Sequence, residues 1–131
     1  MTVKEEEAFV RKLKNSINKI FLVAIIDRKI VGILTFEGGD KPRDKHRGEL
    51  GISTLKSHWG MGVGTTLMEH FLVWAKQTKI VRKVNLKVQT NNERAIKLYK
   101  KFGFKIEGTI TRDAFVKNTF YDSYAMGLVM G

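Results

Sequence analysis

The chain has 131 residues, 43% of them hydrophobic, and a formal net charge of +11 from 24 basic and 13 acidic residues. This length and composition predict one domain with a substantial core. The sequence contains no cysteine, which excludes a disulfide framework and a thiolate nucleophile, and His46, His58 and His70 share no metal-ligand spacing, so no metal is expected. No apolar run has the length of a membrane span and no signal-peptide core is present, so we expect a cytoplasmic protein without a membrane partner.

The first third of the chain is predicted to contain a helix followed by a hairpin. Apolar residues in the segment 5–17 recur at the spacing of an amphipathic helix, at Ala8, Phe9, Leu13 and Ile17. Apolar runs at 20–26 and 30–36 predict two strands, joined by a tight turn at 27–29. A polar loop at 38–46, which holds the only proline, ends this part.

The remaining elements alternate between strands and helices. Strands are predicted at 49–55, 84–88, 104–110 and 120–129, and helices at 62–77 and within 91–104. The order α-β-β-β-α-β-α-β-β, without repeat or linker, predicts a mixed α/β fold in a single domain over residues 1–131.

A glycine-rich stretch lies at the predicted start of the helix 62–77. It reads Trp59-Gly60-Met61-Gly62-Val63-Gly64-Thr65. Glycine lets the backbone approach a ligand closely, and the free N–H groups of a helix N-terminus favour an anion, so the stretch predicts a phosphate site. The nucleoside triphosphate loop requires a Lys that is absent, and the dinucleotide fingerprint fails on its third glycine, while a tight turn without ligand stays an alternative.

A second motif begins at Asn92 and continues through Ala95, Tyr99, Gly103 and Phe104. Asn is a good N-cap and glycine a common helix stop, so the motif predicts a short helix between two strands. Together the two motifs resemble those of the GNAT superfamily of acyl-CoA-dependent N-acyltransferases, in which a loop with Gln/Arg-x-x-Gly-x-Gly/Ala precedes Asn-x-x-Ala-x-x-x-Tyr-x-x-x-Gly-Phe. The resemblance covers nearly the whole chain and implies a GNAT-like mixed sheet flanked by helices, which lacks the usual first strand and helix of the family.

The resemblance implies an N-acetyltransferase that uses acetyl-CoA as co-substrate and needs no metal. The acetyl group would pass directly to a primary amine of a small molecule, an amino acid or a protein N-terminus in a ternary complex. By resemblance, the cofactor-binding residues are Ile52, Ser53, Thr54, Trp59, Gly60, Met61, Gly62, Val63, Gly64, Thr65, Asn92 and Tyr99. Trp59 stands where the family pattern has Gln or Arg, and Asn92 is explained equally well as a cap alone.

Tyr99 is the first of two expected catalytic residues, because the matching tyrosine of the family gives a proton to the departing thiolate. A core aromatic is the alternative for a tyrosine at this spacing. Glu49 is the expected general base, since it is the nearest strand carboxylate to the predicted site. His46 and a water relay to backbone carbonyls remain alternatives for the base.

Positive charge is concentrated in residues 76–105, where ten Lys or Arg accompany one acidic residue, Glu93. A solvated helix face and an electrostatic funnel for a polyanionic cofactor both explain this excess. Nucleic acid is disfavoured as a partner, because no binding motif or exposed stacking platform is present. The alternative function is a basic binding module for acyl-CoA, nucleic acid or protein without transfer activity, and monomer and homodimer are both open.

Overall fold

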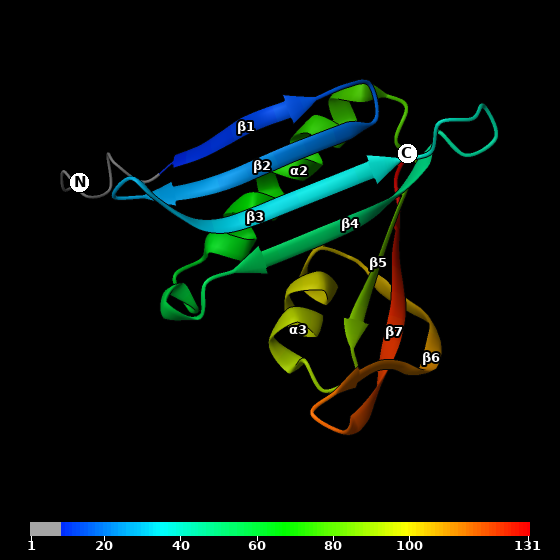
Figure 1. The fold of residues 1–131 in the computed structure, drawn as a ribbon. Coiled ribbons are helices and arrows are strands. Elements are labelled where there is room, and N and C mark those ends of the chain that lie inside the picture. Colours follow the sequence, from blue (N-terminus) through cyan, green and yellow to red (C-terminus); the bar gives the residue numbers. More distant parts are fainter. Residues whose placement is uncertain (1–8) are drawn as a thin grey trace.

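The structure is a computed structural model that describes residues 9–131 (Figure 1). Its seven strands form one sheet in the order β1-β2-β3-β4-β5-β7-β6. Only β4 and β5 run parallel, and every other neighbouring pair is antiparallel. The strands are β1 Phe9–Asn15, β2 Lys19–Ile26, β3 Lys29–Gly38, β4 Arg47–Thr54, β5 Lys83–Gln89, β6 Lys105–Val116 and β7 Thr119–Val129.

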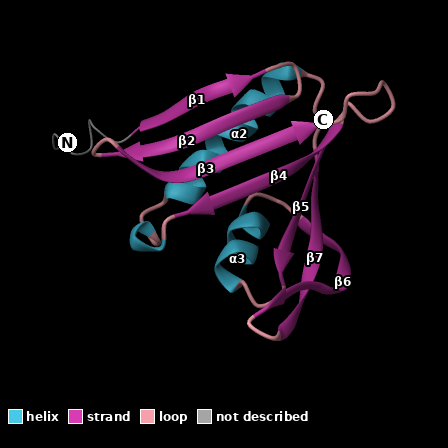
Figure 2. Cartoon of the chain, viewed as in Figure 1, coloured by secondary structure: helices cyan, strands magenta, loops and turns pink. Residues whose placement is uncertain are grey.

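Two α-helices and one short 3-10 helix complete the described part of the chain (Figure 2). The long helix α2, Val63–Thr78, packs against β1 to β4, while α3, Glu93–Lys101, connects β5 to β6. The 3-10 helix η1, Lys56–His58, lies between β4 and α2. Phe36, Phe71 and Trp74 form an aromatic cluster in the core, with ring centroids 5.2 to 6.2 Å apart. Burial of these large side chains joins α2 firmly to the sheet.

The predicted fold class is confirmed, but the helix predicted at 5–17 is wrong. Residues 9–15 form strand β1, which pairs antiparallel with β2, and residues 5–8 lie outside the described part of the chain. The apolar residues that suggested a buried helix face are largely exposed, namely Phe9 (46%), Leu13 (51%) and Ile17 (63%). Hydrogen bonding to the edge of β2 therefore outweighs the helical spacing, as tertiary context commonly does for short segments. No helix lies between β1 and β2.

Strands β4 and β5 separate partway along their length, and the separation leaves a gap between them in the sheet. Their pairing begins at Arg47 and Lys83 and ends at Glu49 and Asn85, although β4 continues to Thr54. The N–H of Leu55 donates to β3, which places the peptide groups of the odd-numbered β4 residues toward β3. The even-numbered residues of β4 beyond the separation consequently present backbone donors and acceptors to an open gap.

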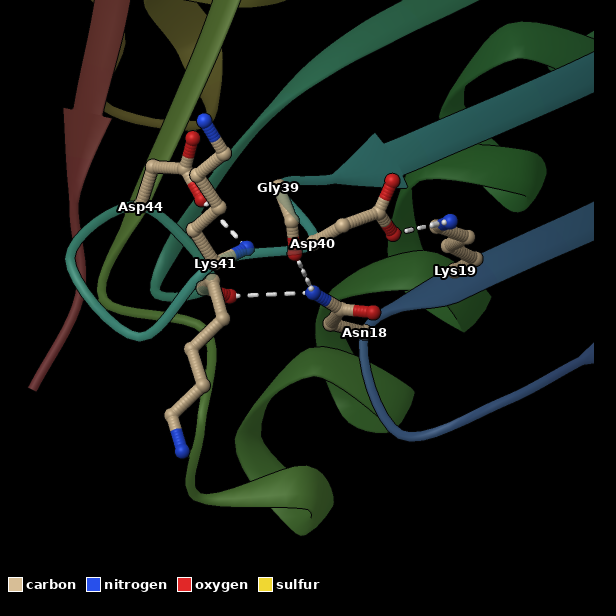
Figure 3. A network of polar contacts seen from close by, with 7 residues as sticks. Asn18, Lys19, Gly39, Asp40, Lys41 and Asp44 are labelled. Carbon is tan, nitrogen blue, oxygen red and sulfur yellow. Dashed lines mark hydrogen bonds and ion pairs between the residues drawn. The ribbon is translucent and has the colours of Figure 1, made fainter.

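A buried asparagine holds the β1–β2 connection against the loop that leads into β4 (Figure 3). Asn18 Nδ2 donates to the carbonyls of Gly39, at 2.8 Å, and Lys45, at 3.2 Å. Nearby, Lys19 Nζ pairs with Asp40 at 2.7 Å, and this hydrogen bond raises the pKa of Lys19 and lowers the pKa of Asp40. The exposed ion pair adds little stability, whereas the buried amide satisfies two carbonyls and fixes the loop.

Within residues 9–131, no helix is both long and apolar enough to cross a membrane.

Candidate functional site

A cleft of about 930 Å³ opens where β4 and β5 separate, between the N-terminus of α2 and helix α3. We call it the first cleft. Three structural parts form its walls: the end of β4, the glycine-rich turn and one face of α3. Its lining residues are Ile52, Ser53, Thr54, His58, Trp59, Gly60, Gly62, Val63, Gly64, Thr65, Asn92, Arg94, Ala95, Lys97, Leu98, Tyr99, Lys100 and Lys101.

The glycine-rich turn owes its shape to backbone conformation. Gly60 and Gly62 have φ angles of +80° and +79°, which other residues rarely adopt, and a Cβ at either position would meet no atom within 4 Å. Gly62 is the N-cap of α2 and provides no side chain to cap the first N–H groups of the helix. Those donors therefore face open space in the first cleft, which is the arrangement that binds phosphate oxygens.

Helix α3 lies close to this turn and provides the basic wall of the first cleft. A Cβ on Gly64 would lie 3.1 Å from Leu98 Cδ2, so glycine is what lets the two helices approach. Arg94, Lys97 and Lys101 lie three and four residues apart, which places them on one helix face. Among the described residues, 9–131, none that lines the cleft is acidic. The site is therefore electrostatically complementary to a polyanion.

Tyr99 is the buried residue of α3 and its side chain reaches the floor of the first cleft. Tyr99 is 6% exposed, and its ring packs against Phe104 with centroids 5.8 Å apart. Burial raises the pKa of Tyr99 to about 12, because desolvation disfavours the phenolate. The hydroxyl therefore remains protonated at neutral pH and is available as a donor.

Asn92 performs the capping role expected from its motif. Its side-chain oxygen accepts from the N–H of Ala95 at 3.2 Å. Because Asn92 also lines the first cleft, capping and ligand binding are compatible at this position.

Glu49 does not line the first cleft but a second cleft, of about 910 Å³. Leu50 and Phe36 are cross-strand partners whose side chains are buried in the core. Side chains alternate along a strand, so Glu49 and its cross-strand partner Glu37 point to the opposite face of the sheet. The two carboxylates share the second cleft with Lys87 of β5. Strand β4 thus lines both clefts, one on each face.

Eleven of the twelve residues predicted for the cofactor line the first cleft, and Met61 is the exception. Met61 belongs to the glycine-rich turn but is 61% exposed and is not among the lining residues. His46, the alternative base, has an exposed side chain, and its carbonyl accepts from the N–H groups of Arg82 and Lys83. Among residues 9–131 no group of three or more metal-binding side chains is found, and the absence of a metal stays a prediction.

Sequence reasoning did not single out Arg94 or Glu37. The spacing of Arg94, Lys97 and Lys101 on one face of a predicted helix was a usable signal for Arg94. No comparable signal existed for Glu37, because its pairing with Glu49 depends on the register between β3 and β4.

Comparison with known proteins assigns the chain to a family. The model of the acetyltransferase (GNAT) family matches residues 2–104. The chain is 38% identical to an L-amino acid N-acetyltransferase of Escherichia coli over 109 residues, which are 82% of this chain and 67% of that protein. It also resembles the crystal structure of a GNAT-family acetyltransferase from Streptococcus pneumoniae, with 38% identity, a TM-score of 0.85 and coverage of 88% of this chain and 70% of that one. The chain therefore spans about two thirds of the length of these relatives.

A putative acetyltransferase from Salmonella typhimurium, solved with acetyl-CoA, shares the fold with a TM-score of 0.78 at 17% identity, covering 86% of this chain and 65% of that one. The family match extends over most of the chain, and the chain belongs to the GNAT family of acetyltransferases. The prediction of an acyl-transfer enzyme of this superfamily is thereby confirmed.

Proposed function

We propose that the chain transfers an acetyl group from acetyl-CoA, held in the first cleft, to the amino group of a small amine bound in the second. The observation that carries the proposal is the cleft itself: uncapped N–H groups of α2, basic side chains of α3 and a protonated Tyr99 converge where β4 and β5 separate. The pyrophosphate would contact the α2 N-terminus, and the pantetheine arm would pair with backbone groups of Ile52 and Thr54.

The acceptor would approach from the other face of the sheet. The second cleft offers the carboxylates of Glu37 and Glu49 to an ammonium group. Lys87, whose ammonium pairs with Asp113 at 3.4 Å, would exchange that exposed ion pair for the carboxylate of the acceptor. Opposite charges in one cleft favour a zwitterionic amino acid, the substrate class named for the Escherichia coli relative. Because residues of β4 line both clefts, the amine and the thioester would meet at the gap beside this strand.

The proposed reaction is a direct transfer in a ternary complex. The Glu49 carboxylate takes a proton from the ammonium, directly or through water, and the free amine forms a bond to the thioester carbon. The carbon–sulfur bond breaks, and the thiolate accepts a proton from the Tyr99 hydroxyl. The nitrogen, which is positively charged once the new bond has formed, loses its second proton through water to the Tyr99 phenolate, which restores the hydroxyl. Burial keeps the Tyr99 hydroxyl protonated, with a pKa of about 12. Desolvation of the departing thiolate raises its pKa above the value of a free thiol, about 8.5, which favours its protonation.

Thiol release provides a direct test of the proposed function. Since the chain has no cysteine, a thiol reagent detects only the CoA that is produced. We expect thiol release that requires both acetyl-CoA and an amine, with amino acids better than polyamines, and an acetylated amine of matching amount by mass spectrometry. Acetyl-CoA binding without thiol release for any amine would instead support a binding module. A cytoplasmic location is part of the proposal and is tested by fractionation of cells that express the protein.

A further inference from the structure

Trp59 and Arg94 come from separate segments and contact each other at the first cleft. Trp59 follows η1, whereas Arg94 lies in the first turn of α3. The guanidinium carbon of Arg94 lies 4.1 Å from the centroid of the Trp59 ring, well within the range of a cation–π interaction. This contact bridges the two walls of the cleft.

The Trp59 side chain is itself held in place on the β4 side. Its Nε1–H donates to the carbonyl of Thr54 at 3.4 Å, and the ammonium of Lys56 lies 5.6 Å from the ring centroid. The residue is nevertheless 45% exposed, so packing alone does not account for its position. The indole ring thus contacts residues of β4 and η1 and also the guanidinium of Arg94.

The guanidinium N–H groups of Arg94 can still donate hydrogen bonds in this arrangement. Within residues 9–131 no carboxylate lies at salt-bridge distance from its guanidinium. Stacking on an aromatic face leaves the N–H groups of a guanidinium free in its own plane. Lys97 and Lys101 line the same cleft and add positive charge beside it.

We infer that Trp59 is a positioning residue that holds Arg94 against a phosphate group of bound acetyl-CoA. The inference rests on the proposed function, because it requires acetyl-CoA in the first cleft. A guanidinium binds phosphate oxygens in bidentate fashion, and the cofactor offers two such groups, its pyrophosphate and its 3′-phosphate. In place of the polar Gln or Arg side chain of the family pattern, Trp59 acts on the phosphate through Arg94.

The test compares acetyl-CoA affinities by isothermal titration for five forms of the chain: wild type, Arg94→Ala, Trp59→Ala, Trp59→Phe and the double alanine variant. We expect Arg94→Ala to weaken binding about ten-fold or more. Trp59→Ala should weaken it several-fold, Trp59→Phe should retain most of the affinity, and the double variant should bind no worse than Arg94→Ala. Arg43→Ala, in an exposed loop outside both clefts, controls for loss of one positive charge. The inference would be overturned if the affinity losses of the two single alanine variants multiplied in the double variant. It would also be overturned if Trp59→Ala bound acetyl-CoA as tightly as wild type.

Two ligands and two salt concentrations identify the phosphate. Arg94→Ala should lower the salt dependence of affinity, since an ionic contact is lost. A larger loss for CoA than for 3′-dephospho-CoA assigns the contact to the 3′-phosphate, and equal losses assign it to the pyrophosphate. An unchanged salt dependence would overturn a phosphate contact, provided that thermal melting shows folded variants. Wild type that binds no acetyl-CoA contradicts the proposed function, whereas normal binding by Arg94→Ala contradicts this inference alone.

Discussion

Glu37 and Glu49 are direct cross-strand partners on β3 and β4, and both side chains line the second cleft. Like charges opposite each other in a sheet are unfavourable unless a cation lies between or beside them. Lys87 lines the same cleft. In the proposed function the ammonium group of the acceptor is a further cation beside the pair, and mutation of each carboxylate tests its role separately.

Glu49→Gln should lower turnover by about a hundred-fold or more at neutral pH, because the proposed base is lost. Glu37→Gln should mainly raise the KM for the amine. Raising the pH toward the amine's own pKa should restore part of the Glu49→Gln rate, since more acceptor is then already deprotonated. Steady-state kinetics over pH measure all three effects. A Glu49→Gln turnover within a few-fold of wild type would contradict the role of Glu49 as the base and would support proton transfer from the ammonium through a water relay.

Tyr99→Phe separates catalysis from packing at the first cleft. The phenyl ring keeps the contact with Phe104, so acetyl-CoA affinity should stay within a few-fold of wild type. Turnover should fall by about 10² to 10⁴, the usual contribution of a general acid. Single-turnover measurements, in which chemistry limits the rate, provide the comparison. Unchanged turnover would contradict a catalytic role for Tyr99 and would support a purely structural role in the core.

The raised pKa of Tyr99 also predicts how stability changes with alkaline pH. An ordinary tyrosine in the unfolded chain ionises near about pH 10, whereas folded Tyr99 keeps its proton up to about 12. The folded state therefore holds one more proton in this window, and the free energy of unfolding should fall by about 1.4 kcal/mol per pH unit from this group. The Tyr99→Phe variant has no phenol to ionise. Denaturant titrations at pH 9 and 11 should therefore show that the free energy of unfolding falls more for wild type than for the variant. Equal losses in both proteins would mean that the phenol ionises in the fold as freely as in solution.

Gly62→Ala tests the glycine-rich turn. At a φ of +79° an alanine costs about 1 to 2 kcal/mol, and relaxation of the turn would move the first N–H groups of α2. We expect a modestly lower melting temperature together with weaker acetyl-CoA binding. Gly108→Ala is the matched control, because a Cβ there meets no atom within 4 Å and φ is not positive. Equal effects of the two substitutions on melting temperature and acetyl-CoA affinity would contradict a special role for the glycine-rich turn.

From residue 19 onward, the sequence predicted the fold well because local patterns and tertiary structure agree. The motif that begins at Asn92 specifies α3 through a cap, an apolar face and a glycine stop, and each feature is found in place. Residues 9–15 behaved differently, since their apolar spacing suited a helix while an unpaired edge of β2 was available to them. Pairing between strands depends on a partner distant in sequence, and single-segment patterns do not contain it.

The candidate site was predictable where it depends on backbone motifs and less so where it depends on register. Gly60, Gly62 and Tyr99 belong to motifs that can be recognised along the sequence, and all three line the first cleft, while their roles stay predictions. Glu49 was chosen as a nearby carboxylate, yet alternation along β4 places it in the other cleft, opposite Glu37. Trp59 lies directly after η1 and Arg94 lies in α3, so their contact forms only in the folded chain and could not be predicted from local spacing.

Isothermal titration of the folded chain with acetyl-CoA tests the central claim most directly. The first cleft should bind one molecule of acetyl-CoA per chain, with an affinity that weakens as salt increases, because basic side chains and helix N–H groups hold its phosphates. Absence of binding at millimolar acetyl-CoA, in a sample whose folding is verified by circular dichroism, would contradict the assignment of this cleft to the cofactor.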